Sequence, residues 1–202
     1  MNVFPRLFIS ALLVFFLTVS AHAKEPPGKS VVMVKINEQI FVDDSAIYDY
    51  YGNLKDVLNI WASVSQADIT IIGILLENNF RVVGSGIPNT TKGNVAKDEI
   101  LKAVEGDDFA SMHLGNYLNA DIVVVGKAIS KGVSMMKGSQ QKSARANVNV
   151  RVIDAKTGEI LAVESQDATA AAIDELSAGV EAIKIASRSI AQNIVKKLSE
   201  KK

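Results

Sequence analysis

Few side chains in this sequence are of the types that carry out catalysis or hold a metal ion. The 202 residues include no cysteine and only two histidines, His22 and His113. Nucleophilic catalysis by serine or cysteine needs a neighbouring base, most often histidine, and zinc needs three or four nitrogen, sulfur or oxygen ligands. His113 lies between Met112 and Leu114 in a predicted amphipathic helix, where a surface position explains it. The sequence therefore predicts no catalytic residue, no metal site and no cofactor.

Two pairs of adjacent carboxylates, Asp43-Asp44 and Asp107-Asp108, have the chemistry for acid–base catalysis. Both pairs stand where helices are expected to begin, and aspartate is a favoured capping residue there, so we predict capping roles. Asp121 is interpreted as a residue at a helix exit or strand start rather than as a metal ligand. The run Gly84-Ser85-Gly86 lacks the lysine and spacing of a phosphate-binding loop. No enzyme class is supported.

Two surface features are better suited to recognising another protein. Met135 and Met136 lie in a Gly- and Ser-containing segment, Lys131–Gln141, and flexible methionine side chains suit adaptable partner surfaces. Arg145 and Arg151 lie on the polar side of an alternating strand. The alternatives are a methionine loop folded back on its own domain and a strand face that is simply solvated. We take Met135, Met136, Arg145 and Arg151 as candidate partner contacts.

The first 23 residues have the pattern of a secretory signal peptide. Arg6 precedes an apolar run from Leu7 to Val19, and Ala21-His22-Ala23 matches the A-x-A cleavage pattern. The run is shorter than the roughly 20 apolar residues of a transmembrane helix, and an uncleaved anchor is the alternative. We predict cleavage after Ala23 and location in the periplasm, where a cysteine-free chain relies on its core instead of disulfides.

The charges of the chain cancel, with 22 Lys and Arg against 22 Asp and Glu. Such a balance gives no long-range attraction to nucleic acid or anionic lipid. Charged residues also interrupt every later apolar stretch. We therefore expect no nucleic-acid partner and no direct membrane span after the signal peptide is removed.

The remaining sequence predicts one domain, residues 31–202, after a short leader, residues 24–30. Expected strands cover residues 30–42, 80–83, 122–125, 144–152 and 160–165. Expected helices cover residues 48–79, 95–105, 107–119 and a long C-terminal segment. The predicted fold class is α/β, a single mixed β-sheet of about five strands with helices packed on it and a long C-terminal helix.

The C-terminal helix shows the strongest helical pattern in the chain. Its apolar stripe consists of Ile173, Leu176, Val180, Ile183, Ile190, Ile194 and Leu198. Burying such a stripe contributes on the order of 10 kcal/mol, so a monomeric domain would not leave it in water. We predict that the helix packs on the sheet face formed by Ala146, Val148 and Val150.

Three segments resemble motifs of one family of periplasmic domains. They are N-N-F-R-V-V at residues 78–83, L-G-N-Y-L-N-A-D-I-V-V-V-G at residues 114–126 and V-R-V-I-D-A-K-T-G-E-I-L at residues 150–161. These are similar to the domain shared by the curli secretion-channel protein CsgG, the middle region of flagellar assembly protein T and the N-terminal domain of TolB. The resemblance covers the chain from about Ser30 to the C-terminus.

Members of this group serve as secretion pores, motor-ring parts, translocation accessories and activators of wall synthases. The resemblance implies a non-catalytic protein that binds other periplasmic or outer-membrane proteins in an envelope-spanning assembly, flagellar or of the secretion and curli type. A homo-oligomer is one form of such an assembly. Two alternatives stay open, a periplasmic module that binds a peptide or glycan and an activator of a cell-wall synthase.

This sequence departs from the curli protein in two respects. No cysteine follows the apolar run, so the lipoprotein route to a membrane is closed. A spanning hairpin needs about twenty residues, whereas Lys131–Gln141 and Asp154–Gly158 are much shorter. We therefore expect no long amphipathic hairpin and no pore made by this chain alone.

Overall fold

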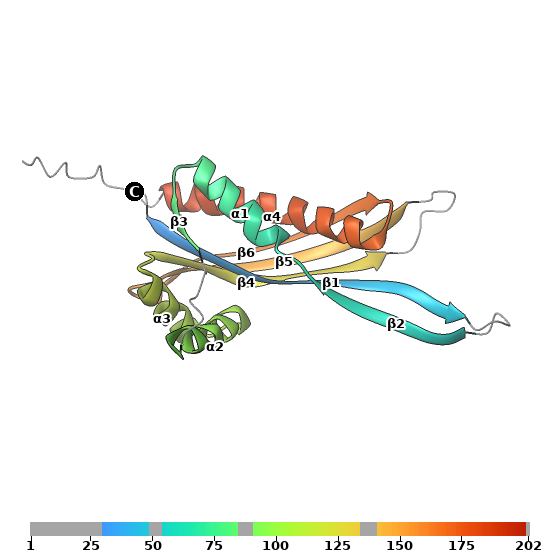
Figure 1. The fold of residues 1–202 in the computed structure, drawn as a ribbon. Helices are drawn as coiled ribbons and strands as arrows, with labels where there is room; N and C mark the ends of the chain where they lie inside the picture. The colour runs from blue at the N-terminus through green and yellow to red at the C-terminus, as the bar shows by residue number, and fades with distance from the viewer. Residues whose placement is uncertain (1–29, 49–53, 85–90, 134–140, 201–202) are drawn as a thin grey trace, which may run out of the picture.

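The computed structural model describes residues 30–48, 54–84, 91–133 and 141–200, with backbone alone for residues 43–48, 54–61 and 91–97. It contains a six-stranded mixed sheet with helices on both faces (Figure 1). The strands are β1 (Val31–Tyr48), β2 (Leu54–Ser63), β3 (Arg81–Val83), β4 (Ile122–Val133), β5 (Lys142–Asp154) and β6 (Ile160–Ala172). The helices are α1 (Gln66–Glu77), α2 (Thr91–Glu105), α3 (Asp108–Leu118) and α4 (Glu175–Glu200).

The strand order is β2-β1-β4-β5-β6, and β3 lies beside the start of β1. β1 runs parallel to β3 and β4, while the pairs β1–β2, β4–β5 and β5–β6 are antiparallel. The predicted α/β class, with one mixed sheet and a long C-terminal helix, is confirmed, and the sheet has six strands.

One face of the sheet is covered along its length by α1 and α4 (Figure 1). Ile183, Ile190 and Ile194 of α4 are buried in one cluster with alternate residues of β1, β4 and β5. Ala146, Val148 and Val150 belong to this cluster, so the predicted docking face of α4 is confirmed.

The predicted stripe of α4 is wrong at its N-terminal end. Ile173 precedes the helix and is 85% exposed, and Leu176 is 41% exposed. Small residues form much of the buried face instead, with Ala178, Ala182 and Ala186 fully enclosed. Small side chains let the helix axis lie close to the sheet, so the buried stripe depends on contact with the strands rather than on hydrophobicity alone.

The opposite face of the sheet is covered only in part, by α2 and α3 (Figure 1). Ala110 and Leu114 of α3 pack on Met33, Val123 and Ile153. These sheet residues all lie near the start of β4 or the end of β5. The other half of this face has no helix above it among the described residues.

The predicted helix over residues 48–79 is wrong in its first half. That segment forms β2, paired with β1 in a register that places Phe41 opposite Trp61 and Val42 opposite Ile60, and α1 begins only at Gln66. Leu54, Leu58 and Trp61 recur at helical spacing, and pairing with β1 overrides this local pattern. Asp43-Asp44 therefore lies at a register shift within β1, and its predicted capping role is also wrong.

The same pairing also forms a long hairpin, which the sequence analysis did not predict. β1 pairs with β4 only as far as Phe41 opposite Lys131, and from there to Tyr48 it pairs with β2 alone. The two strands form a ribbon that projects beyond the rest of the sheet (Figure 1).

Other predicted elements are present with longer boundaries. β4 continues to Val133 and β6 to Ala172, because β5 offers each a full-length antiparallel partner. Helix α2 begins at Thr91, four residues before the predicted start at residue 95. Asp107 caps α3 as predicted, accepting a hydrogen bond from the Ala110 amide at 3.0 Å.

At two positions of the family-like motifs, the structure explains why the residue is glycine. A Cβ at Gly126 would lie 2.0 Å from the Asn149 carbonyl oxygen, so β4 and β5 approach too closely there for a side chain. Gly158 has φ of +74°, which the turn between β5 and β6 requires and glycine adopts without strain. Within the described residues, no helix has the length and apolar character of a membrane span.

Candidate functional site

The uncovered half of the sheet carries an alternating set of exposed side chains on the side away from α4. In β4 these are Lys127, Ile129, Lys131 and Val133. Neighbouring positions in β5 and β6 are Arg145, Asn147, Asn149, Val163, Ser165, Asp167 and Thr169. We call this set the open face.

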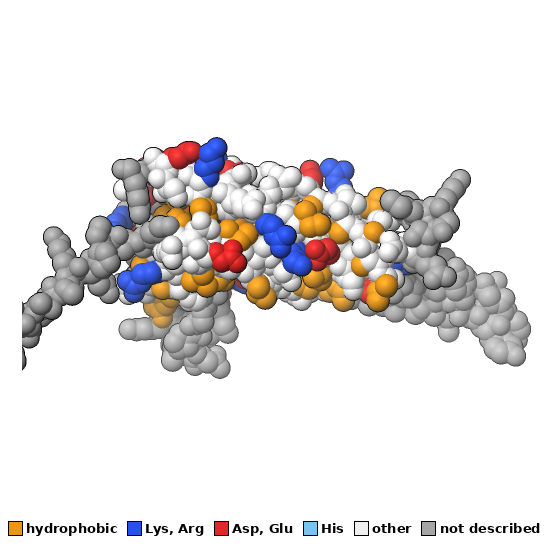
Figure 2. All heavy atoms as spheres, turned by 90° about the horizontal axis from the view of Figure 1, so that it is seen from above, with side chains coloured by type: hydrophobic (Ala, Val, Ile, Leu, Met, Phe, Trp, Pro, Cys, Tyr) orange, Lys and Arg blue, Asp and Glu red, His pale blue; other side chains and the backbone are white. Residues whose placement is uncertain are grey.

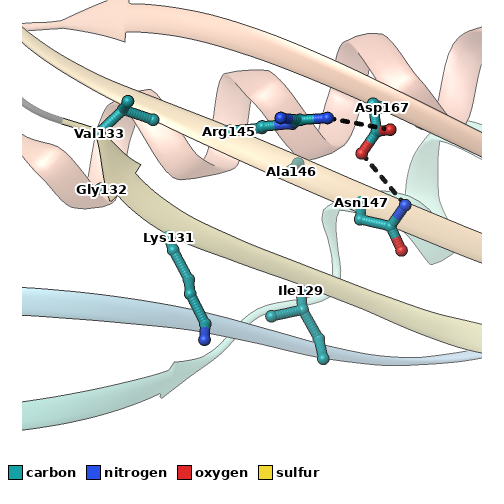
Figure 3. A pocket seen from close by; sticks show the side chains of 8 residues that line it. All are labelled: Ile129, Lys131, Gly132, Val133, Arg145, Ala146, Asn147 and Asp167. Carbon is teal, nitrogen blue, oxygen red and sulfur yellow. Dashed lines mark hydrogen bonds and ion pairs between the residues drawn. The ribbon is translucent and has the colours of Figure 1, made fainter.

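Part of the open face is hollowed. A depression of about 420 Å³ is lined by residues 129, 131–133, 145–147 and 167, and Figure 3 shows their side chains. Ile129 and Val133 are 39% and 48% exposed, so apolar surface is open to solvent on its floor and rim. Such a shallow, mixed surface suits a protein segment better than a small molecule, which usually occupies an enclosed pocket.

An ion pair forms one side of this depression. Arg145 Nη2 lies 3.3 Å from Asp167 Oδ2, and Asn147 Nδ2 donates to Asp167 Oδ1 at 3.1 Å (Figure 3). The hydrogen bond from Asn147, together with Arg145, lowers the pKa of Asp167. The carboxylate is therefore held ionised and balances the charge of Arg145.

The two lysines of the open face have no such balance. Neither Lys127 nor Lys131 forms an ion pair with any residue that the structure describes. Lys131 Nζ lies 5.9 Å from the centre of the Phe41 ring. Among the described residues, the open face therefore presents two lysines along β4 that have no ion-pair partner.

A second depression, of about 320 Å³, continues the open face toward α2. It is lined by the end of α2 at Glu105 and Gly106, by Lys127, and by β5 and β6 residues that include Arg151 and Val163. Val163 is 60% exposed. The two depressions lie along the same pair of strands, β4 and β5, and we call the two together the groove.

The predicted partner contacts have different positions. Arg145 is exposed on the open face, as predicted. Arg151 is instead held within the molecule, because its guanidinium lies 2.6 Å from Asp108 Oδ1 and donates to the carbonyl oxygens of Gly106 and Ala103. It ties α2 and α3 to the sheet. Met135 and Met136 lie outside the described residues.

A buried carboxylate was missed by the sequence analysis. Glu38 is 2% exposed, and its Oε1 accepts a hydrogen bond from the Asp68 amide at 3.0 Å, at the start of α1. Ser65, which precedes α1, makes no side-chain capping bond, so Glu38 caps this helix from a distant strand. The signal was present, because Glu38 continues the alternation of Val34 and Ile36 that marks the core side of β1.

The surroundings of Glu38 fit a structural role. Asp68 accepts hydrogen bonds from the Ile36 amide and from Lys35 Nζ, both at 2.6 Å. Burial raises the pKa of Glu38, although amides of α1 oppose the shift. No three His, Cys, Asp or Glu residues of the described chain are grouped to hold a metal ion.

The other residues considered for chemistry also have structural positions. His113 is exposed on α3, with its ring centre 4.3 Å from that of Phe109. Asp121 accepts hydrogen bonds from the Val31 amide at 2.9 Å and from Lys156 Nζ at 3.0 Å, and these bonds lower its pKa. It lies just before β4, as predicted for a strand-start residue.

Solved structures share the fold at low sequence identity. A hypothetical protein from Chlamydia trachomatis is 14% identical, with 85% of this chain and 98% of that chain covered and a TM-score of 0.50. A PelC dodecamer from Paraburkholderia phytofirmans is 12% identical, with 86% and 90% covered and a TM-score of 0.41. The LpoB C-terminal domain from Salmonella enterica is 15% identical, with 69% and 82% covered and a TM-score of 0.34. The first likeness shows the fold alone, the other two scores are too low to carry an argument, and no curated protein matches the sequence.

The sequence itself matches a protein family over residues 99–200, just over half of the chain. The family is described as "Curli production assembly/transport component CsgG". The matched stretch runs from within α2 to the end of α4 and contains β4, β5 and β6, the strands of the open face. The narrower resemblance to flagellar assembly protein T and TolB stays a prediction. The chain belongs to the CsgG family.

Proposed function

We propose that this protein acts without catalysis, by binding other proteins in an envelope-spanning assembly of the bacterial periplasm, and that the open face is its binding surface. The observation that carries the proposal is the exposure of Ile129 and Val133 on the half of the sheet face that no described helix covers. Exposed apolar residues grouped among charged ones are typical of protein-binding sites. An assembly of the secretion or curli type agrees with the family's description.

The same surface argues against the alternative of a module that binds a small peptide or glycan. Ligand pockets of that kind are deep and enclose most of the ligand. The open face holds two shallow depressions, with Arg145 and Asn147 already paired to Asp167 and its apolar groups in the open. Activation of a cell-wall synthase would be one form of protein binding, and a homo-oligomer would be another.

Site-specific photo-crosslinking in living cells tests this proposal. A photoreactive amino acid is placed at Ile129, which is 39% exposed on the open face, or at Ile185, which is 43% exposed on the outer side of α4. The matched exposure controls for chance collisions. We expect position 129 to capture a defined envelope protein and position 185 to capture none. Equal capture at both positions, or none at either, would contradict the proposal.

A further inference from the structure

The charge of the open face is concentrated in one strand. Lys127 and Lys131 flank Ile129 in β4, and all three side chains are exposed. The neighbouring arginines are already neutralised, Arg145 by Asp167 and Arg151 by Asp108. A partner that lies along β4 therefore meets two lysines, one on each side of an apolar residue, that form no ion pair with any described residue.

Each of the two lysines lines one of the two depressions. Lys131 lines the depression of about 420 Å³, and Lys127 lines the neighbouring one of about 320 Å³. From Lys127 to Val133 the strand extends roughly 20 Å at about 3.3 Å per residue. A helix of that length has about 13 residues, at 1.5 Å of rise for each.

The layers of the fold indicate what kind of segment fits. On the other face of the sheet, α4 lies along the strands and buries its apolar side against them. On this face, apolar residues of α2 and α3 pack against the sheet as far as Val125. A further helix would complete the second layer over the remaining half, since helices packed on both faces are the usual way to cover such a sheet.

We propose that the groove binds an acidic amphipathic helix of a partner protein. This inference rests on the proposed function and deepens it. Apolar side chains of the helix pack on Ile129 and Val133, and its carboxylates pair with Lys127 and Lys131. A hollowed surface favours a helix over the flat surface of an anionic membrane, because the lysines line the depressions rather than a projecting ridge.

The test measures the binding of two synthetic helical peptides to the chain without residues 1–23. One peptide has a Leu and Ile face flanked by Glu, and the other has Lys in place of each Glu. We expect calorimetry to show that the Glu peptide binds at least about tenfold more tightly than the Lys peptide. The two lysines of the protein attract the carboxylates of the first peptide and repel the ammonium groups of the second. The variant Lys127→Glu with Lys131→Glu should reverse this preference, whereas Lys196→Glu, an exposed lysine on α4, should leave it unchanged. Both variants should keep the parent's thermal unfolding midpoint, because the lysines are exposed.

Three results would overturn the inference. The first is Glu-peptide binding that the double Lys variant does not weaken, and the second is no binding of the Glu peptide. The third is binding to phosphatidylglycerol vesicles, but not to the Glu peptide, that depends on Lys127 and Lys131, which would assign the groove to a membrane surface. The crosslinking experiment separates these failures from failure of the proposed function. Capture of a defined protein at Ile129, combined with any of the three, would leave the proposed function standing without this helix.

Discussion

At the scale of single residues, Glu38 shows how one carboxylate couples two distant elements. It lies in the core-facing series of β1 and caps the first turn of α1, which begins 28 positions later at Gln66. Its second oxygen, Oε2, has no hydrogen-bond partner within the described structure. A buried carboxylate with one oxygen unpaired is costly when it is ionised.

Replacement of Glu38 by Gln tests this cost. The pKa of Glu38 is raised above its ordinary value of 4.5, so the folded state retains a proton that the unfolded state has lost. The resulting stability is fully present below pH 4.5 and is lost as the pH rises through the folded-state pKa. We expect Glu38→Gln to raise the free energy of unfolding near neutral pH, because the amide side chain is neutral whereas the carboxylate would have to be buried in its charged form.

Urea denaturation of both proteins over a range of pH measures this difference. The Gln side chain keeps an oxygen that can accept a hydrogen bond from the Asp68 amide, so the helix cap is retained. The two proteins should approach equal stability in acid and diverge as the pH rises. A variant that is less stable than the parent at neutral pH would mean that the ionised carboxylate stabilises α1.

Two glycines provide a matched pair of substitutions. Gly126→Ala would place a methyl group 2.0 Å from the Asn149 carbonyl oxygen and force β4 and β5 apart. Gly73→Ala would place the same group in open space on the surface of α1. We expect the first to lower the free energy of unfolding by about 1–3 kcal/mol and the second to raise it by up to about 1 kcal/mol. Thermal unfolding decides, and equal effects from the two changes would contradict the close approach at Gly126.

At the scale of elements, α4 is a core element that covers one face of the sheet together with α1. Its buried side meets β1, β4, β5 and β6, and its charged side bears the ion pair of Lys184 with Glu181. Figure 2 looks down on this layer and shows apolar side chains in separate small groups among charged ones. The outer side of α4 and α1 is therefore a mixed surface.

The docking of α4 predicts opposite results for two neighbouring isoleucines. Ile183 is fully buried and Ile185 is 43% exposed. Ile183→Asp places an unpaired charge in the core and should unfold the domain, because the loss is comparable to the roughly 5–15 kcal/mol stability of a whole protein. Ile185→Asp should leave the circular dichroism spectrum unchanged. A folded Ile183→Asp variant that only lost a partner would mean that α4 is an interaction arm.

At the scale of the whole molecule, the two faces of the sheet are unequal. One face is filled by α1 and α4, and the other is filled only near the start of β4. The projecting β1–β2 ribbon adds a second region with little support from other elements (Figure 1). Isolated two-stranded ribbons are only marginally stable in water, so both features agree with a protein that is completed by its partners.

Export decides whether those partners are periplasmic. We expect the purified protein from its native host to begin at Lys24 and to be recovered in the periplasmic fraction, because Ala21-His22-Ala23 presents small residues at a signal-peptidase site. Intact-mass spectrometry checks the mature N-terminus. An N-terminus at Met1 in the mature protein would support the alternative of an uncleaved anchor.

Features that depend on near neighbours in the chain were determined by the sequence alone. The alternation of Ala146, Val148 and Val150 with polar residues predicted a strand with one wet face, and β5 has it. Asp107 predicted the cap of α3, and the strands expected over residues 144–152 and 160–165 are present as β5 and β6. Each of these is decided by backbone conformation and hydrogen bonds within a few residues, which is the range that a local pattern reports.

Features that depend on distant partners were decided only by the tertiary structure. Residues 54–63 became a strand because β1 was there to pair with them. Arg145 and Arg151 have the same place in the alternation of β5, yet only Arg151 lies beneath the α2–α3 junction and is held by Asp108. Lys127, Ile129 and Lys131 became an open face because β4 continued along β5 beyond the reach of any described helix. Pairing and coverage are contacts between elements far apart in sequence, so the spacing of residues along one element does not contain them.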